Sequence, residues 1–122
     1  MDKDKIKNLL IIDDEQINRT LIKMLINRIS NNFRIFEAET GTEALNLLKN
    51  QKFDLVLLDI LLPDINGLEI LDKIKADKII IISALSKDEL NLKNIDLKNI
   101  EYLSKPFDIK FFQNLLMKEL AK

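Results

Sequence analysis

Short runs of large apolar residues alternate along the chain with longer stretches in which apolar residues recur at helical spacing. The runs Leu9–Ile12, Leu55–Leu58 and Ile79–Ile82 are continuous, which is typical of strands covered on both faces of a sheet. Segments 33–36 and 100–103 are less uniformly apolar and predict two further strands. The strand at 100–103 is expected at a sheet edge. The pattern therefore predicts five strands.

A stretch with helical spacing follows each predicted strand. In the first stretch, over 15–30, the residues expected to face the core are Leu21, Ile22, Leu25 and Ile29. Thr40 predicts the start of the second helix, because Glu43 stands at the spacing of a capping box. The remaining helices are expected over 67–75, 87–95 and from 108 onward, with 76–78 as a tight connection. The fourth helix is expected to be short, frayed or mobile, because Asn and Asp side chains compete for the local hydrogen bonds of its backbone.

Alternating strands and helices predict an α/β fold, a doubly wound five-stranded parallel sheet with helices on both faces. Right-handed crossovers bring the carboxyl ends of all strands to one edge, where such sheets bind ligands. The polar residues that follow strand ends are Asp13, Asp14, Asp59, Ser83 and Lys105. We expect these five side chains to meet in one shallow pocket.

Composition narrows the chemistry that this pocket can perform. The chain has 122 residues, which suits one domain, and it contains neither cysteine nor histidine. Disulfides, thiolate metal sites and histidine bases are therefore excluded. A net charge of −1 provides no basic field for nucleic acid. The charged segment 1–5 precedes an apolar run too short for a signal peptide or a membrane span, so we expect a cytoplasmic protein.

Three carboxylates at one sheet edge repel one another unless a cation compensates them. A cluster of oxygen ligands suits Mg²⁺ or Mn²⁺, and Mg²⁺ commonly shares a phosphate oxygen. A carboxylate can itself be the nucleophile and form an aspartyl-phosphate. Acids after a strand also often serve only as N-cap or first-turn residues of a helix, and this is the interpretation we favour for Glu15. Asp64 is expected to be an ordinary turn residue.

Four segments carry a resemblance to a known family. They are IIDDE (11–15), LVLLDILLPDINGLE (55–69), IIIISA (79–84) and YLSKPF (102–107). Together and in this order they resemble a response-regulator receiver domain of two-component signalling, over the whole chain 1–122. The resemblance implies a fold like that of flavodoxin and the chemotaxis regulator, with strand order 2-1-3-4-5. It also implies a single domain, with no output domain in this chain.

The resemblance implies a phosphoryl acceptor and a Mg²⁺ site. Asp59 is expected to accept the phosphoryl group. The metal ligands are expected to be the carboxylates of Asp59 and Asp14, the backbone carbonyl of Leu61 and, through water, Asp13. Mn²⁺ is expected to substitute for Mg²⁺.

The resemblance also implies residues that bind the phosphoryl oxygens and respond to them. Ser83, Lys105 and the backbone of Ala84 are expected to contact those oxygens. Ser83 and Tyr102 are the expected switch residues, and the Lys105–Pro106 peptide bond is expected to be cis. Taken alone, each of these residues would be a routine turn, surface or strand residue.

Other positions concern lifetime, docking and backbone shape. Leu61 and Leu85 occupy the two positions that tune phosphoryl lifetime in the family, and neither side chain can orient a water by hydrogen bonding. We therefore expect slow dephosphorylation. Ile17 and Met24 are expected either at the margin of the core or in a docking patch for a kinase. Gly67 is expected where a flexible or left-handed residue is useful.

The function that the resemblance implies is a signalling switch, not an enzyme. A histidine kinase or histidine phosphotransfer protein would phosphorylate Asp59. The surface of the fourth helix, fifth strand and fifth helix would then change toward a downstream target or output domain, and a homodimer could form. Two alternatives remain: a pseudo-receiver that binds partners without phosphorylation, and a Mg²⁺-dependent aspartyl-phosphate phosphatase. The second lacks the acid that such enzymes carry two residues after the nucleophile, where Leu61 stands.

Overall fold

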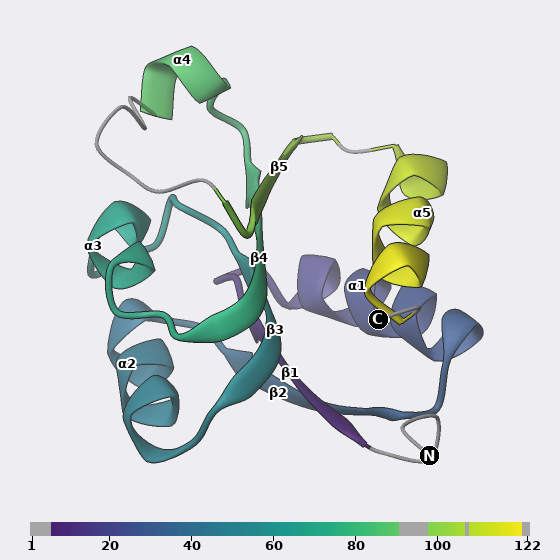
Figure 1. Ribbon diagram of the computed structural model, residues 1–122. Coiled ribbons are helices and arrows are strands. Elements are labelled where there is room, and N and C mark those ends of the chain that lie inside the picture. The colour runs from purple at the N-terminus through teal and green to yellow at the C-terminus, as the bar shows by residue number, and fades with distance from the viewer. Residues whose placement is uncertain (1–5, 91–97, 107, 121–122) are drawn as a thin grey trace.

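The computed structural model describes residues 6–90, 98–106 and 108–120. Strands and helices alternate along this part of the chain (Figure 1). The strands are β1 (Lys7–Ile12), β2 (Phe33–Ala38), β3 (Phe53–Leu58), β4 (Ala76–Ser83) and β5 (Ile100–Ser104). The helices are α1 (Gln16–Ile29), α2 (Gly41–Asn50), α3 (Gly67–Leu71), α4 (Lys87–Leu90) and α5 (Ile109–Leu120). Among the described residues, no helix is long and apolar enough to cross a membrane.

The five strands form one sheet in the order β2-β1-β3-β4-β5, and every neighbouring pair is parallel. This arrangement confirms the predicted fold class and strand order. It also confirms that the segment around 100–103 forms an edge strand. The chain order reverses between β1 and β3, and α/β sheets bind their ligands at such a reversal, outside the carboxyl ends of the strands.

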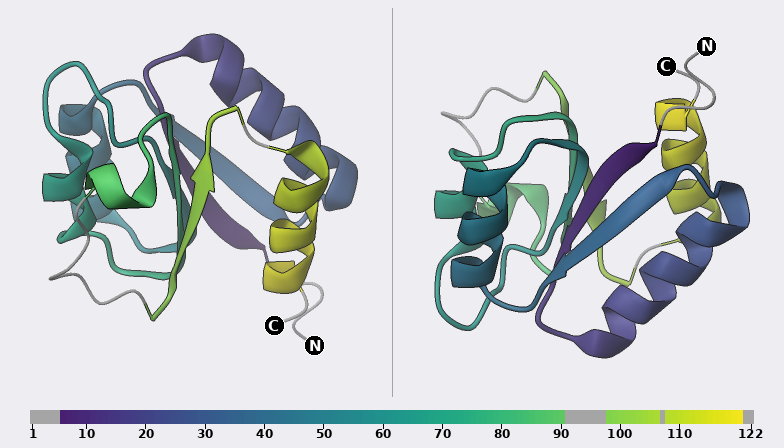
Figure 2. Two further views of the ribbon diagram at one scale, coloured as in Figure 1. Left: turned by 90° about the horizontal axis from the view of Figure 1, so that it is seen from above. Right: turned by 90° about the horizontal axis from the view of Figure 1, so that it is seen from below.

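Helices cover both faces of the sheet, as predicted. Helices α1 and α5 lie on one face, whereas α2 and α3 lie on the other (Figures 1 and 2). Alternate side chains of β1 supply the two cores: Leu9 and Ile11 pack toward α1 and α5, and Leu10 and Ile12 pack in the opposite cluster. The continuous apolar runs of the sequence therefore reflect burial on both faces.

The buried stripe of α1 only partly matches the predicted one. Ile22 and Leu25 are buried as expected, and Ile26 joins them. Leu21 is 38% exposed, so its predicted core position was wrong. The residue that completes the buried side of the helix is Arg19, which precedes Ile22 by three positions and Ile26 by seven.

The region between α3 and β5 departs from the predicted boundaries. Helix α3 ends at Leu71 instead of continuing to 75. Residues 76–78, predicted as a connection, are the first residues of β4, because Ala76 pairs with Phe53 and Lys78 pairs with Leu55. Helix α4 covers Lys87–Leu90, and the remainder of the predicted fourth helix, 91–95, lies outside the described residues.

Gly67 is required for a reason other than the predicted one. None of the described glycines has a positive φ, so no left-handed conformation is involved. Instead, the start of α3 passes close to the backbone of Ile60: a Cβ on Gly67 would lie 2.6 Å from the Ile60 Cα atom. The Gly67 N–H also donates to the Ile60 carbonyl over 2.9 Å.

Candidate functional site

Sheet register brings the first and third strand ends together. Ile12 pairs with Leu58, so the residues that follow them, Asp13 and Asp59, are neighbours at the carboxyl edge. The Asp59 N–H donates to the Ile12 carbonyl over 2.9 Å, and the Asp13 N–H donates to the Ala38 carbonyl over 3.0 Å. Both aspartates are buried, with relative exposures of 2% for Asp13 and 6% for Asp59. Two carboxylates are thus held under the surface by main-chain pairing.

A third carboxylate completes an acidic pocket. Oxygen atoms of Asp13, Asp14 and Asp59 all lie within 4.8 Å of one another, and Asp14 is the exposed member. A buried or half-buried group of like charges is unfavourable without a compensating cation. These three residues offer carboxylate oxygens, the ligands that a hard divalent cation such as Mg²⁺ prefers. The residues present therefore fit such an ion.

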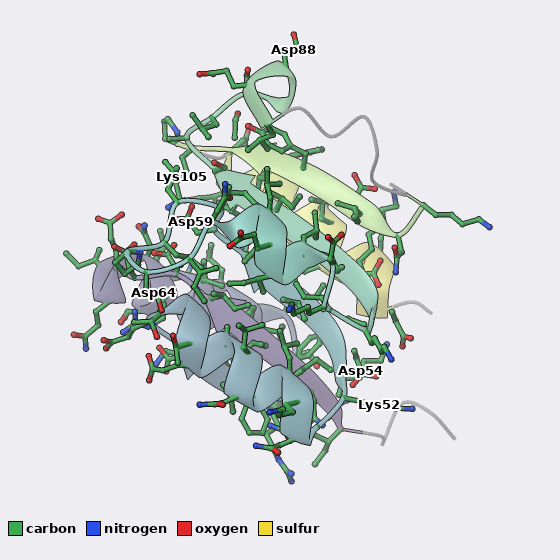
Figure 3. The ribbon with its side chains drawn as sticks, turned by 90° about the vertical axis from the view of Figure 1, so that its left-hand side faces the viewer. Lys52, Asp54, Asp59, Asp64, Asp88 and Lys105 are labelled. Atoms are coloured by element: carbon green, nitrogen blue, oxygen red, sulfur yellow. The ribbon has the colours of Figure 1, made fainter. Side chains whose placement is uncertain are left out.

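Lys105 supplies positive charge to the same pocket. Its Nζ lies 2.8 Å from Asp59 Oδ2 and 3.3 Å from Asp13 Oδ2, and Figure 3 shows Lys105 beside Asp59. Burial raises the pKa of Asp59, although the hydrogen bond from Lys105 opposes that rise. Burial disfavours the ammonium of Lys105, but the hydrogen bond to Asp59 and the charge of Asp13 outweigh it and raise the pKa of Lys105. Lys105 therefore stays charged.

The next residues of the predicted site lie on β4 and β5. Ser83 is fully buried at the end of β4, and its Oγ accepts a hydrogen bond from the Leu85 N–H over 3.1 Å. Ala84, between them, is exposed. The hydroxyl of Tyr102 is buried and has no hydrogen-bond partner among the described residues. The Lys105–Pro106 peptide bond is cis, as expected.

The loop after Asp59 is tied back to the pocket and to α2. Asp59 Oδ1 accepts from the Leu61 N–H over 3.0 Å. Asp64 is not an ordinary turn residue, because its carboxylate accepts from Gly41 N and from the N–H and hydroxyl of Thr42, at 2.8 to 3.0 Å. These bonds cap the first turn of α2 from another loop and lower the pKa of Asp64 to about 2.

Thr40 and Glu15 occupy the N-cap positions of α2 and α1, respectively. Thr40 caps α2 as predicted, since its Oγ1 accepts from Glu43 N over 3.1 Å. Glu15 stands at the N-cap position of α1, but its side chain makes no capping bond there. Instead, Asp13 Oδ1 accepts from the Glu15 N–H over 2.8 Å, which orients the buried aspartate.

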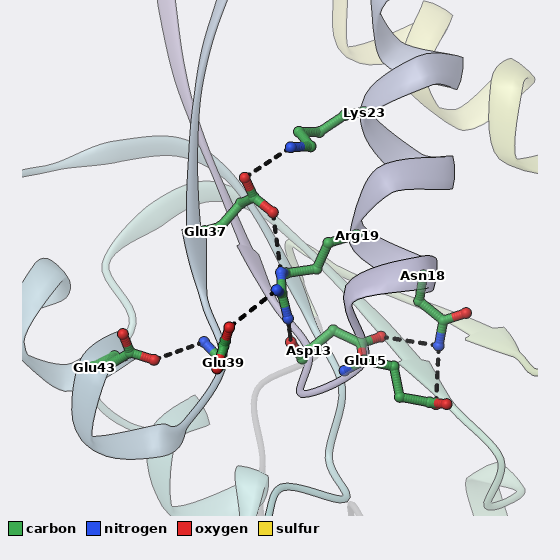
Figure 4. Close-up of polar contacts among 8 residues, drawn as sticks. All are labelled: Asp13, Glu15, Asn18, Arg19, Lys23, Glu37, Glu39 and Glu43. Atoms are coloured by element: carbon green, nitrogen blue, oxygen red, sulfur yellow. Dashed lines mark hydrogen bonds and ion pairs between the residues drawn. The ribbon is translucent and has the colours of Figure 1, made fainter.

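A network that the sequence prediction missed lies behind the acidic pair. The guanidinium of Arg19 donates to the Asp13 carbonyl and to the carboxylates of Glu37 and Glu39 (Figure 4). Lys23 also contacts Glu37, at 2.8 Å. The signal that could have revealed this network is an arginine at helical spacing from the apolar stripe of α1.

Ile17 and Met24 lie on the surface and not at the margin of the core. They are 82% and 54% exposed, and with Leu21 they face a groove of about 410 Å³ on α1. Leu61 and Leu85 share a second groove of about 440 Å³, between the loop after β3 and α4. Leu61 is 51% exposed.

Fold and pocket together define an α/β protein with a cluster of three carboxylates at the carboxyl edge of its sheet. The model of the response regulator receiver domain family matches residues 9–116. The chain therefore belongs to this family, the receiver domains of two-component systems. Receiver domains generally bind Mg²⁺ at an acidic cluster and interact with histidine kinases and output domains.

Known proteins support the same assignment. Sporulation initiation phosphotransferase F of Bacillus subtilis is 30% identical over 118 residues, which cover 93% of this chain and 94% of that protein. The probable transcriptional regulator ycf29 of Pyropia yezoensis is 32% identical over 126 residues, covering 95% of this chain. A CheY-like receiver domain protein of Methanospirillum hungatei has the same fold, with a TM-score of 0.80 at 24% identity over 96% of this chain and 95% of that one.

Several of the relatives are longer than this chain. The match spans 55% of the ycf29 protein, and 40 to 46% of sensory transduction proteins and a transcriptional regulatory protein from Staphylococcus and Bacillus. The chain thus spans about half the length of those relatives.

Proposed function

We propose that this domain accepts a phosphoryl group on Asp59 and transmits its phosphorylation state through a change in surface. The observation that carries the proposal is the charge arrangement around Asp59: two further carboxylates within 4.8 Å and the Lys105 ammonium at 2.8 Å. This arrangement suits a nucleophilic carboxylate that receives a highly charged group. A phosphorylated histidine of a kinase or phosphotransfer protein is the proposed donor. The location proposed is the cytoplasm, which the domain would share with that donor.

The proposed reaction breaks the N–P bond of phosphohistidine as an Asp59 Oδ–P bond forms, and the imidazole leaves with a proton from solvent. The Asp59 Oδ1 atom is already engaged by the Leu61 N–H. The Lys105 ammonium, which now contacts the Asp59 carboxylate, would contact the phosphoryl oxygens after transfer. Ser83 and the backbone of Ala84 would donate to those oxygens. No proton-accepting side chain is required, since Asp59 reacts as a carboxylate.

Mg²⁺ would be held directly by the carboxylates of Asp14 and Asp59 and by the Leu61 carbonyl, and through water by Asp13. When bound, the ion would neutralise charge on the transferring phosphoryl group. The buried position of Asp13 supports an indirect role, because its Oδ1 already accepts from Glu15 N. The exposed position of Asp14 supports a direct one.

The first experiment is intact-mass analysis after incubation with acetyl phosphate, with Mg²⁺ and with chelator. We expect one added phosphoryl group that depends on Mg²⁺ and is absent in Asp59→Asn. Asp54→Asn is the matched control, because Asp54 accepts from the Asn8 N–H at the opposite end of the sheet (Figure 3). Phosphorylation of Asp59→Asn would refute the acceptor assignment. An unmodified wild-type chain that a phosphohistidine donor also fails to modify would favour the pseudo-receiver alternative.

The proposed readout involves Ser83, Tyr102 and the surface of α4, β5 and α5. Movement of the Ser83 hydroxyl toward a phosphoryl oxygen would break its bond with Leu85 N. The buried Tyr102 hydroxyl, unpartnered among the described residues, is a group whose environment such a movement could change. A downstream target, an output domain or a second copy of the domain would then recognise the altered surface.

Docking of the phosphodonor is proposed at the groove on α1. Its support is the exposure of Ile17 and Met24 beside Leu21. We expect Ile17→Lys and Met24→Lys to slow transfer from a phosphohistidine protein while leaving transfer from acetyl phosphate unchanged. Met117→Lys is the control, because Met117 is 57% exposed on α5. Equal slowing with both donors would contradict docking at this groove.

A long phosphoryl lifetime is proposed from Leu61 and Leu85. These side chains line one groove, and neither can hydrogen-bond a hydrolytic water. We expect Leu61→Asn to shorten the half-life of the phosphorylated protein several-fold, measured by loss of the added mass after the donor is removed. A half-life that is already short in the wild type and unchanged by polar residues at both positions would contradict this proposal.

A further inference from the structure

We infer that Arg19 is a positioning residue for the acidic pocket: it fixes the peptide group between Asp13 and Asp14 and thereby sets the geometry for Mg²⁺. This inference rests on the proposed function, because it assumes that these carboxylates bind the ion. Arg19 itself does not belong to the set of proposed ligands, and its contact with Asp13 is to the main-chain carbonyl.

Burial is the first observation behind the inference. Arg19 is 5% exposed, and arginine is almost never so buried unless it is paired. Its three partners lie in different elements: the Asp13 carbonyl at 2.7 Å, Glu37 at 3.0 Å and Glu39 at 3.3 Å (Figure 4). The planar guanidinium thus joins α1 to the end of β1, to β2 and to the loop before α2.

The hydrogen bond from Arg19 to the Asp13 carbonyl connects this network to the acidic pocket. The Asp13 carbonyl belongs to the peptide group whose nitrogen is that of Asp14. Asp13 is also held by its N–H bond to Ala38 and by its carboxylate bond to Glu15 N. The carboxylate of Asp14, by contrast, makes no hydrogen bond within the described residues, so its placement depends on the peptide that Arg19 holds.

Charge compensation supports a geometric role over a direct electrostatic one. Two cations, Arg19 and Lys23, face two carboxylates, Glu37 and Glu39. The hydrogen bond from Lys23 lowers the pKa of Glu37, which therefore stays ionised beside Arg19. The positive and negative charges of these four side chains therefore compensate one another. The network contacts the metal site through the hydrogen bond from Arg19 to the Asp13 carbonyl.

The competing explanation is that Arg19 merely anchors α1 to β2. The two roles differ in what they change. An anchor alters the free energy of unfolding and leaves the Mg²⁺ affinity of the folded protein unchanged. A positioning residue alters that affinity, and partners that orient metal ligands typically change it by about 10- to 100-fold when they are replaced.

Calorimetric titration with Mg²⁺ distinguishes these roles in the whole, unphosphorylated chain. We expect Arg19→Met to raise the Mg²⁺ dissociation constant by about tenfold or more. The matched control is Lys23→Met, which removes the other cation bound to Glu37 but has no bond to Asp13. Its dissociation constant is expected to stay near that of the wild type. Urea unfolding in chelator verifies that each variant is folded.

A second variant keeps the test decisive if Arg19→Met fails to fold. Arg19→Lys retains the positive charge between Glu37 and Glu39 but lacks the fork that also reaches the Asp13 carbonyl, so weaker Mg²⁺ binding is expected here too. Folded Arg19 variants with the wild-type dissociation constant would overturn the inference. A wild-type chain that binds no Mg²⁺ would instead overturn the proposed function, so the two failures are distinguishable.

Discussion

Replacing Gly67 with alanine would place a methyl carbon where the backbone of Ile60 already lies. The added Cβ would be 2.6 Å from the Ile60 Cα, 2.8 Å from its carbonyl oxygen and 3.0 Å from its carbonyl carbon. Backbone atoms cannot rotate aside as a side-chain end can, so the start of α3 or the Ile60 segment must shift. Ile60 directly follows Asp59, so that shift reaches the pocket.

The magnitude follows from two opposing effects. Overpacking a well-packed site costs about 1–3 kcal/mol, and the shift also strains the 2.9 Å bond from Gly67 N to the Ile60 carbonyl, worth about 1 kcal/mol. Replacing glycine by alanine restricts the unfolded chain, which returns about 0.4–1 kcal/mol. We therefore expect Gly67→Ala to lower the free energy of unfolding by about 2 kcal/mol.

Gly41 provides a matched control, because Gly41 and Gly67 each occupy the first position of a helix. The three heavy atoms nearest to a Cβ on Gly41 would all belong to the side chain of Ile65, with the Ile65 Cβ at 2.9 Å, and Ile65 lies in a loop. Gly41→Ala is expected to lose less stability than Gly67→Ala, because its nearest contacts are longer and involve side-chain atoms of Ile65 instead of backbone atoms. Urea unfolding in chelator measures both variants. A Gly67→Ala protein as stable as the wild type would refute the close-approach explanation.

Three further predictions concern single groups. Asp64 has a pKa of about 2 in the folded chain against an ordinary value of 3.8, so its contribution to stability is complete above pH 4 and is lost as the pH falls toward 2. The stability difference between wild type and Asp64→Asn should therefore narrow over that range in urea titrations, and a difference independent of pH would contradict the cap. Tyr102→Phe removes a buried hydroxyl without a described partner, so thermal unfolding should show equal or greater stability, by up to about 1 kcal/mol. A clear loss would mean that the hydroxyl is satisfied. Lys105→Met should destabilise the chain by roughly 2 kcal/mol in chelator, because Asp13 and Asp59 lose a shared counter-charge. Millimolar Mg²⁺ should reduce that loss, and an unchanged loss would count against a shared cation site.

Much of the fold was predictable because its buried strands are continuous runs of apolar residues. The continuous runs at Leu9–Ile12 and Ile79–Ile82 could be buried only if both faces of their strands were covered. Alternation with helices then restricts the topology, and right-handed crossovers bring the strand ends to one edge. The expected meeting of Asp13, Asp14 and Asp59 follows from that rule and is present in the structure.

Element ends and individual contacts were less predictable, because they depend on pairing between distant segments. Residues 76–78 join β4 because the partner strand β3 extends beside them, and nothing local in Ala76-Asp77-Lys78 favours a strand. Leu21 was expected in the core because its spacing fits, yet the packing direction of α1 buries Arg19 and Ile26 instead.

The sequence by itself determined the fold class and the identity of the residues at the carboxyl edge, since both depend on order and period along the chain. Tertiary structure alone decided how those residues are held. Arg19 reaches the Asp13 carbonyl, and Asp64 caps α2 from 22 to 23 residues away, because folding brings those groups within hydrogen-bonding distance. A buried charge or a capping carboxylate needs a hydrogen-bond partner, and tertiary packing decides which polar group lies close enough to be that partner. The hydrophobic periodicity of the sequence does not predict which group it will be.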